Sequence, residues 1–455
     1  MCSMSARHLW PALILAWTLA IVATPARAVA QTSLQPFEGL FPGLNGDTSK
    51  QRLDLTFALS ESYDNDVPTE IQQLVPGAAT SPLQAGFSTL WLGGVNYRRH
   101  RHVQFQTTLN SALRYSPEAI QRVQNVGQTG GLLLSIPLPA RTSLTMTENA
   151  AYSPALLQGL FLAQSADVDL SAITSISRDY TTRQSDAYFS TTTLSLSRTF
   201  GRRSHLDGSA DYQYNNYPDT NGNRRHLTVY GGRTEFSRGF GRGTSFRATY
   251  HYRTGEYGFE NLGTTAEHGV ELSIENSRRL SAHRRATVGF SLGSSTIGIP
   301  EAATVVGATV RRRYPTTGEG RLALQFERSW QFRASYSRGL QYVGDVGQPI
   351  VADRLGFALD GLLTKRTDLQ MSAAYSNGDG ALITGTRFKS YNADVRWRGA
   401  VTNTLAGFVE GYLYVYDFNG APIELGLPQQ LNHVGARVGL MLWIPTLGRA
   451  GRSGR

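Results

Sequence analysis

Apolar and polar residues alternate along most of this chain, in paired segments of about ten to fourteen residues. In HVQFQTTLNSALRY (102–115), Val103, Phe105 and Leu109 share one face, whereas Asn110 and the glutamines share the other. This two-residue period predicts a β-strand with one apolar face and one hydrated face. The pattern recurs about eighteen times with no helical pattern between, which predicts a closed barrel with lipid outside and water inside.

The fold expected from these segments is all-β, a transmembrane antiparallel β-barrel of about eighteen strands. The strands expected to run away from the periplasm are 51–63, 102–115, 141–153, 203–217, 243–256, 284–296, 331–343, 367–376 and 403–418. Those expected to return are 86–98, 125–137, 186–199, 225–238, 266–279, 318–330, 352–365, 388–399 and 430–444. Sixteen or twenty strands are the alternatives, because Glu148 interrupts one apolar face and 304–314 resembles a further strand.

Two regularities support a membrane barrel rather than a soluble sheet. Tight connections, such as Phe200–Arg203, Phe240–Arg242 and Trp330–Gln331, alternate with longer ones, as expected for short periplasmic turns and long outer loops. Eight of the nine outgoing strands end near a tyrosine, whose ring favours the headgroup level of a membrane. The predicted aromatic girdle is Tyr63, Tyr115, Tyr152, Tyr214, Tyr252, Tyr342, Tyr375 and Tyr416.

The N-terminus has the features of a secretory signal peptide. Arg7 precedes an apolar run over 9–23, and the small-residue site Ala26-Arg27-Ala28 follows it. Cleavage after Ala28 and cleavage after Ala30 fit equally well. The expected division of the chain is a signal peptide (1–30), a periplasmic N-terminal segment (31–50), the barrel (51–445) and a C-terminal tail (446–455).

Composition narrows the chemistry further. Cys2 is the only cysteine and lies in the leader, so the mature chain would have no disulfide, catalytic thiol or cysteine metal ligand. No phosphate loop, nucleophile elbow or zinc-protease helix motif occurs, and His100 and His102 fit a solvated turn better than a metal pair. We therefore predict no enzyme, no catalytic residues, no metal and no cofactor. Nucleic-acid binding is not expected either, because the basic residues alternate with acids.

The chain has a net charge of +10, and most of its basic residues are arginines, several of them on the polar phase of the strands. An arginine facing lipid would cost about 2–4 kcal/mol, so these side chains are expected to point inward. The pore-lining candidates are Arg98, Arg114, Arg247, Arg253, Arg333, Arg396, Arg398 and Arg437. Carboxylates share their phase, which leaves two interpretations of equal weight: a mildly anion-preferring channel, or a lumen braced by arginine–carboxylate pairs. Basic turns such as 98–102 are expected to contact lipid headgroups, with an anion funnel as the alternative.

The longest expected outer connection, 154–185, is too apolar in its first third for a purely solvated loop. One interpretation is a constriction inside the barrel, with Asp167, Asp169, Arg178, Asp179 and Arg183 near the pore. The alternatives are packing across the barrel mouth and a contact between protomers. The segment 125–137 is the candidate contact of a homo-oligomer, because its apolar face lacks aromatic residues.

The segment LDLTFALSESYDNDV (53–67) resembles the opening strand of outer-membrane β-barrel porin families, including barrels associated with exopolysaccharide loci. NAAYSPALL (149–157) is similar in style. The resemblance implies an outer-membrane channel but does not indicate its substrate. One departure is that the last strand, HVGARVGLMLWIP (433–445), continues into a ten-residue tail instead of finishing at an aromatic residue.

The function expected from the sequence is passive diffusion of small hydrophilic solutes, including anionic ones, through the bacterial outer membrane, with a mild preference for anions. The alternative is an export conduit for an anionic exopolysaccharide, which would need periplasmic export proteins as partners. An enzyme on a barrel scaffold ranks lower.

Overall fold

The structure is a computed structural model, and it describes the strands of the chain with most of their short turns. The described residues are 51–67, 84–100, 102–117, 123–153, 187–218, 224–241, 243–258, 264–281, 284–298, 312–326, 329–342, 348–382, 387–419 and 430–447. The predicted signal peptide, the segment 31–50 and the constriction candidates Asp167, Asp169, Arg178, Asp179 and Arg183 lie outside them.

One antiparallel sheet contains all the strands. They are β1 (Gln51–Val67), β2 (Gln84–His100), β3 (Gln104–Tyr115), β4 (Val123–Leu138), β5 (Thr142–Ser153), β6 (Ala187–Phe200), β7 (Ser204–Pro218), β8 (Arg224–Phe240), β9 (Thr244–Tyr257), β10 (Thr264–Ser281), β11 (Arg284–Gly298), β12 (Arg312–Arg313), β13 (Thr316–Phe326), β14 (Trp330–Tyr342), β15 (Pro349–Thr364), β16 (Thr367–Gly380), β17 (Arg387–Ala400), β18 (Leu405–Asn419) and β19 (Gln430–Leu447).

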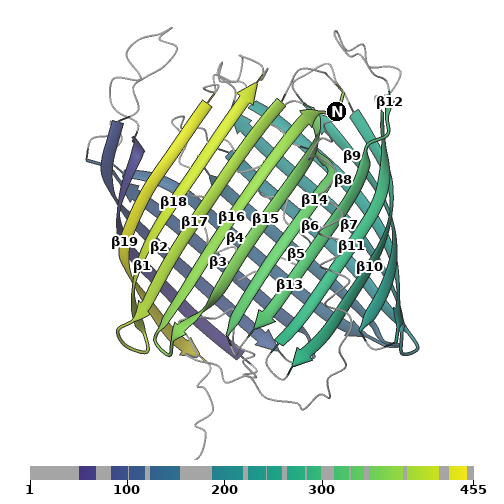
Figure 1. The fold of residues 1–455 in the computed structure, drawn as a ribbon, viewed down its shortest axis with the longest axis horizontal. Helices are drawn as coiled ribbons and strands as arrows, with labels where there is room; N and C mark the ends of the chain where they lie inside the picture. The colour runs from purple at the N-terminus through teal and green to yellow at the C-terminus, as the bar shows by residue number, and fades with distance from the viewer. Residues whose placement is uncertain are drawn as a thin grey trace, which may run out of the picture.

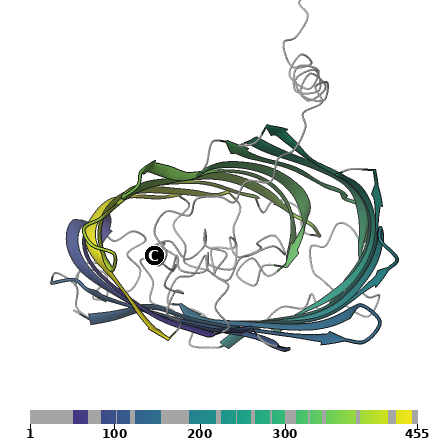
Figure 2. The same ribbon diagram turned by 90° about the horizontal axis from the view of Figure 1, so that it is seen from below.

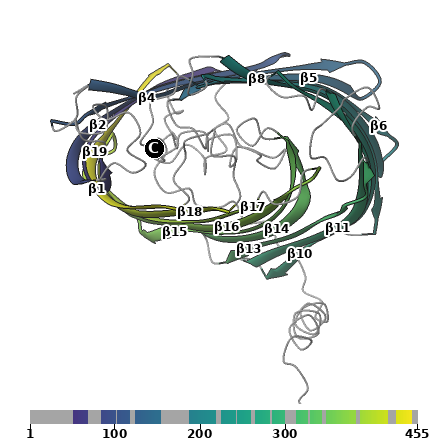
Figure 3. The ribbon, with the colours of Figure 1, turned by 90° about the horizontal axis from the view of Figure 1, so that it is seen from above.

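Sequential strands pair with each other, and β1 pairs with β19, so the sheet closes into a barrel (Figure 1). The sheet has 19 strands, but β12 has only two residues and β11 pairs with β13 beside it. Eighteen long strands therefore form the wall, which confirms the predicted fold class and strand number. Seen end-on, the barrel has an elongated cross-section (Figures 2 and 3).

The connections between strands alternate in length around the barrel. At one end they contain two to four residues, and at the other five or more, as the sequence predicts. We call these ends the short-turn end and the long-loop end. In the β8–β9 turn, Gly241 and Gly243 have φ of 69° and 103°, a conformation that side chains disfavour. The turn predicted at Trp330–Gln331 is wrong by a few residues, because Trp330 begins β14 and the turn occupies 327–329.

The outer surface of the barrel is apolar. On most strands exposed hydrophobic side chains recur at alternate positions, among them Leu59 on β1, Leu272 on β10 and Leu440 on β19. Large exposed apolar surfaces are rare on soluble proteins, and a continuous apolar belt is what a membrane barrel presents to lipid. The described residues include no helix long and apolar enough to cross a membrane.

Aromatic rings border this belt at both ends. Tyr97 and Phe105 lie 5.9 Å apart near the short-turn end, and Tyr63 and Phe87 lie 5.1 Å apart near the long-loop end. Tyr97 is opposite Leu53, and Tyr63 is ten residues farther along β1. At about 3.3 Å per residue and a tilt of about 40°, this separates the two aromatic levels by about 25 Å, the height of a transmembrane barrel's apolar band.

Candidate functional site

The candidate site is the inner face of the barrel, which the register assigns residue by residue. Exposed hydrophobic side chains mark the outward phase of most strands, including all those that carry the arginines discussed here, so the residues between them point inward. All eight arginines singled out in the sequence are on the inward phase: Arg98, Arg114, Arg247, Arg253, Arg333, Arg396, Arg398 and Arg437. Their role in lining a pore stays a prediction.

Most of these arginines contact a carboxylate on a neighbouring strand, and Arg114 of β3 reaches past β2 to Asp64 of β1. Arg247 is 2.8 Å from Glu275 and 3.8 Å from Glu235, so it lies between two acids. The other arginine–carboxylate pairs are Arg114–Asp64 at 3.1 Å, Arg253–Glu267 at 3.1 Å, Arg333–Asp360 at 2.8 Å, Arg398–Asp368 at 2.5 Å and Arg437–Glu410 at 2.5 Å. Arg396 instead donates to the amide oxygen of Gln370.

These pairs fall into two environments. The Arg333–Asp360 pair is exposed, and Arg247 is one-third exposed. The Arg437–Glu410 and Arg114–Asp64 pairs are almost fully buried. A paired charge attracts ions from solution less than a bare one, because its partner cancels much of its field. Arginine–carboxylate pairs of this kind are what the braced-lumen interpretation expects, and a preference of the lumen for anions stays a prediction.

The most buried polar network lies where the barrel closes, on the inner faces of β1, β3, β18 and β19. Asp64 has no exposed surface, and it accepts hydrogen bonds from Arg114, from Ser62 at 3.1 Å and from the Tyr412 hydroxyl. The Nε2 atom of His433 lies 3.5 Å from the same carboxylate, and its ring stacks on Tyr412. A buried carboxylate needs such donors, since an uncompensated buried charge is very costly. The network ties four strands together across the β1–β19 seam.

A second feature of the inner face is a flap, which we define as 339–342 of β14, 349–352 of β15 and 378–382 at the end of β16. β13 pairs with β14 only as far as Gly318 opposite Arg338. Beyond this point β14 remains paired with β15, and β15 with β16. The three strand ends therefore separate together from β13, while β16 stays paired with β17 as far as Asp379 opposite Arg387. The end-on views show green strand ends turned into the barrel (Figures 2 and 3).

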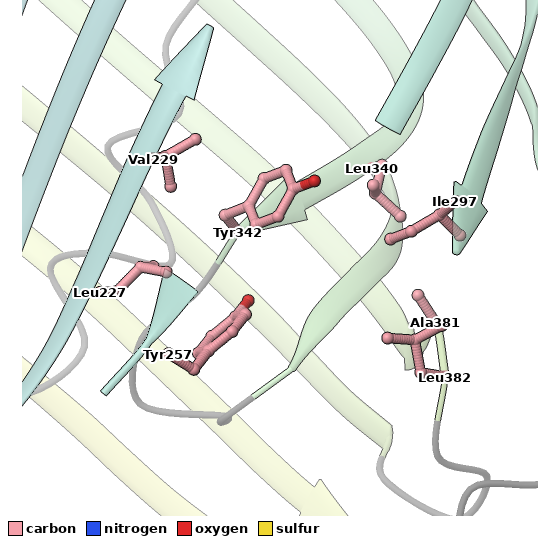
Figure 4. Packing of buried hydrophobic residues seen from close by; sticks show 8 residues of the cluster. All are labelled: Leu227, Val229, Tyr257, Ile297, Leu340, Tyr342, Ala381 and Leu382. Carbon is pink, nitrogen blue, oxygen red and sulfur yellow. The ribbon is translucent and has the colours of Figure 1, made fainter. Parts of the chain in front are cut away.

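The flap packs against the inner surface of strands that are distant in the wall. Leu340, Tyr342, Ala381 and Leu382 of the flap form a buried cluster with Leu227 and Val229 of β8, Tyr257 of β9 and Ile297 of β11 (Figure 4). Four strand spacings separate β14 from β9 along the wall, a distance of about 19 Å. Contact between them is therefore possible only because the flap crosses part of the lumen. The flap narrows the barrel at the long-loop end.

Polar contacts hold the edges of the flap. Arg253 of β9 donates to the Leu340 carbonyl at 3.2 Å, and its guanidinium lies 5.8 Å from the centre of the Tyr342 ring. A Cβ atom on Gly255 would come within 2.3 Å of that ring, so glycine is required for the ring to lie against β9. On the other side, Arg313 of β12 donates to the carbonyls of Gly380 and Ala381.

The predicted aromatic girdle divides into two groups. Tyr63, Tyr115, Tyr152, Tyr214, Tyr252 and Tyr375 are on the outward phase of their strands. Tyr342 and Tyr416 are not at the lipid surface. Tyr342 has an outward phase but is buried in the flap cluster, and Tyr416 has an inward phase and is 2% exposed. For Tyr342 alternation alone does not reveal this, because a flap that turns inward keeps the pattern of a lipid-facing strand. For Tyr416 the register does, because the exposed Val409 and Leu413 mark the other phase of β18 as outward.

Sequence reasoning missed the flap residues as contributors to the lumen. Leu340 and Tyr342 have the spacing of membrane-facing residues, and Ala381 and Leu382 follow the end of a strand. The one available signal is the short β13, which starts at Thr316 and leaves the end of β14 without a partner on that side among the described residues. Within the described residues, no group of three or more side chains is placed to hold a metal ion.

Neither a protein-family model nor a curated protein matches this chain. Among solved structures it is similar to OccK9 (OpdG) of Pseudomonas aeruginosa, with 13% identity, TM-score 0.41, and coverage of 90% of this chain and 100% of that one. It is also similar to P. aeruginosa OccK2 (OpdF) in complex with glucuronate, with 10% identity, TM-score 0.43, and coverage of 87% and 98%. The P. aeruginosa outer membrane protein OpdK gives 10% identity, TM-score 0.38, and coverage of 86% and 99%.

These values do not place the chain in the family of those proteins. Its own geometry decides the fold: eighteen long antiparallel strands, a closed β1–β19 seam, an apolar exterior and a charged interior. This is a porin-type β-barrel. The resemblance to outer-membrane porin families is confirmed at this level of architecture.

Proposed function

We propose that this porin-type barrel is an outer-membrane channel through which small hydrophilic solutes diffuse passively, with a weak preference for anions. The single observation that carries the proposal is the contrast between the two faces of one closed sheet. The outward phase is an apolar belt bordered by aromatic rings, and the inward phase carries arginines and carboxylates from β1 to β19. A closed barrel of this kind separates lipid from a polar interior.

The weakness of the anion preference follows from the ion pairs. Arg247 and Arg333, which are 32% and 55% exposed, each have a carboxylate at 2.8 Å. Solute anions would therefore meet arginines whose charge is already largely balanced. The same balance suits neutral and zwitterionic solutes as well as small carboxylates.

The direct test is single-channel recording of the refolded full chain in a planar lipid bilayer, with the reversal potential measured across a potassium chloride gradient. We expect discrete conductance steps and a reversal potential close to zero, displaced slightly toward the value for chloride. The folded state is checked by the mobility of the unheated protein in SDS gels. Absence of steps from a folded barrel would contradict passive diffusion and would favour the polysaccharide export conduit.

A further inference from the structure

We propose that the flap is the gate of the channel, and that Arg253 is the latch that holds it against the wall. The inference rests on the proposed function, because a gate has meaning only in a channel. It gives a specific role to one of the inward arginines. Arg253 is here a positioning residue, since it acts by fixing the flap.

The flap is built so that it can move separately from the wall. Its strands are paired with one another, Leu340 opposite Val351 and Ile350 opposite Gly380, so it moves as one small sheet. Toward β13, pairing stops at Arg338. On the opposite side, Gly378 and Asp379 remain paired with Phe388 and Arg387 of β17, so the flap is joined to the wall along that edge. A segment that is paired along one edge opens at lower cost than a segment that is paired along both.

Arg253 makes the contacts that join the flap to the opposite wall. Its Nη2 atom donates to the Leu340 carbonyl, and its guanidinium lies beside the Tyr342 ring. Glu267 orients it from β10, with a carboxylate oxygen 3.1 Å from the same Nη2 atom. Glu267 has no exposed surface and also contacts Nε2 of His251 at 3.1 Å. Glu267, which His251 also contacts, therefore holds the Arg253 guanidinium in the position from which it contacts the flap.

The buried cluster under the flap supplies the rest of the closing force. Leu227 and Ile297 of the wall, and Ala381 of the flap, have no exposed surface. Burial of apolar surface favours the closed position without specifying its register. Arg253 specifies it, because the hydrogen bond to Leu340 and the ring contact with Tyr342 are formed together in one position only.

The first test measures access to the flap by thiol labelling, independently of conduction. In the full chain with Cys2→Ser, Ala381→Cys places one small thiol at a fully buried flap position. We expect slow reaction with a membrane-impermeant maleimide. Adding Arg253→Met should raise the rate by about tenfold, the effect of losing one charged hydrogen bond of about 1.4 kcal/mol.

The matched control is Arg333→Met, which removes another inward arginine with a carboxylate partner, far from the flap contacts. We expect the labelling rate of Ala381→Cys to be unchanged in this variant. Equal labelling rates in the two methionine variants, or fast labelling of Ala381→Cys in the parent, would contradict the proposed role of Arg253.

A second pair of variants leaves every charge in place. Gly255→Val puts a side chain where the Tyr342 ring lies, whereas Gly208→Val adds one at a strand glycine with no heavy atom within 4 Å of the new Cβ. We expect faster labelling and more frequent open steps for Gly255→Val only. No difference between the two valine variants would also overturn the gate. The conductance of the parent tests the proposed channel. The difference between the two methionine variants, and between the two valine variants, tests the proposed gate. A failure of the channel and a failure of the gate are therefore distinguishable.

Discussion

At the scale of single residues, the inner face carries many charged side chains, and the contribution of each ion pair to the free energy of unfolding depends on its burial. The Arg437–Glu410 pair has side-chain exposures of 7% and 0%, whereas the Arg333–Asp360 pair has 55% and 25%. Both are arginine–carboxylate pairs inside the same barrel. Water screens the attraction within the exposed pair, so that pair contributes little to stability. In the buried pair each charge needs the other, because burying either one alone would be very costly.

We predict that Glu410→Ala lowers the free energy of unfolding by about 3–5 kcal/mol, because Arg437 would remain buried without its carboxylate. Asp360→Ala, its exposed counterpart, should cost less than about 1 kcal/mol. The measurement is denaturant unfolding in lipid vesicles, followed by tryptophan fluorescence. Similar losses for the two variants would contradict the difference in burial.

A second residue-scale prediction concerns ion selectivity. Replacing both acids that flank Arg247, in the double variant Glu235→Gln and Glu275→Gln, should move the reversal potential toward that of chloride, because the guanidinium loses its balancing charges. Arg247→Gln should move it in the opposite direction. Reversal potentials under a salt gradient report both changes. An unchanged value in all these variants would mean that permeating ions do not pass this part of the wall.

At the scale of elements, the strands could be predicted from the sequence and the flap could not. A two-residue period identifies a strand because lipid and water select opposite kinds of side chain on its two faces. For β10 the alternation predicts a strand over 266–279, and the strand extends over Thr264–Ser281. Strand pairing in order then follows from short connections. Leu340 and Tyr342 obey the same period although they contact the wall and not lipid. Alternation reports that one face is apolar but not what covers that face.

Neighbouring positions on β10 give a direct test of the two faces. Leu272 is 52% exposed on the outer belt, and Ser273 follows it on the inward phase. Leu272→Arg should destabilise the folded barrel by about 2–4 kcal/mol, the cost of a cation in the lipid core. Ser273→Arg should be tolerated, with a change below about 1 kcal/mol. The comparison uses the same unfolding experiment, and the reverse order of the two losses would contradict the assigned phase.

At the scale of the whole molecule, closure is the property on which the others depend. The β1–β19 ladder extends from Leu53 opposite Leu447 to Asp64 opposite Gly435, and the buried Asp64 network lies across it. Inside a bilayer, an open edge would leave backbone groups without hydrogen-bond partners. The seam therefore determines whether the other strands form a barrel at all.

Deletion of β19 (430–447) should abolish the folded state, because β1 and β18 would each keep one unpaired edge. We expect the unheated variant to migrate in SDS gels like the boiled one, whereas the intact chain shows heat-modifiable mobility. A truncated chain that still resists SDS would show that β1 can pair directly with β18.

Among the described residues, β14 has no pairing partner on its β13 side beyond Arg338, which has a further consequence for the association of one barrel with another. An unpaired strand edge is a template to which an edge of a second molecule can add, and proteins avoid this by covering such edges. Here the edge is turned away from neighbouring molecules, and Arg253 occupies the Leu340 carbonyl that a foreign strand would otherwise use. The contact that narrows the barrel thus also protects it from aggregation. Each opening of the flap would expose an unpaired strand edge at the long-loop end for as long as it lasts.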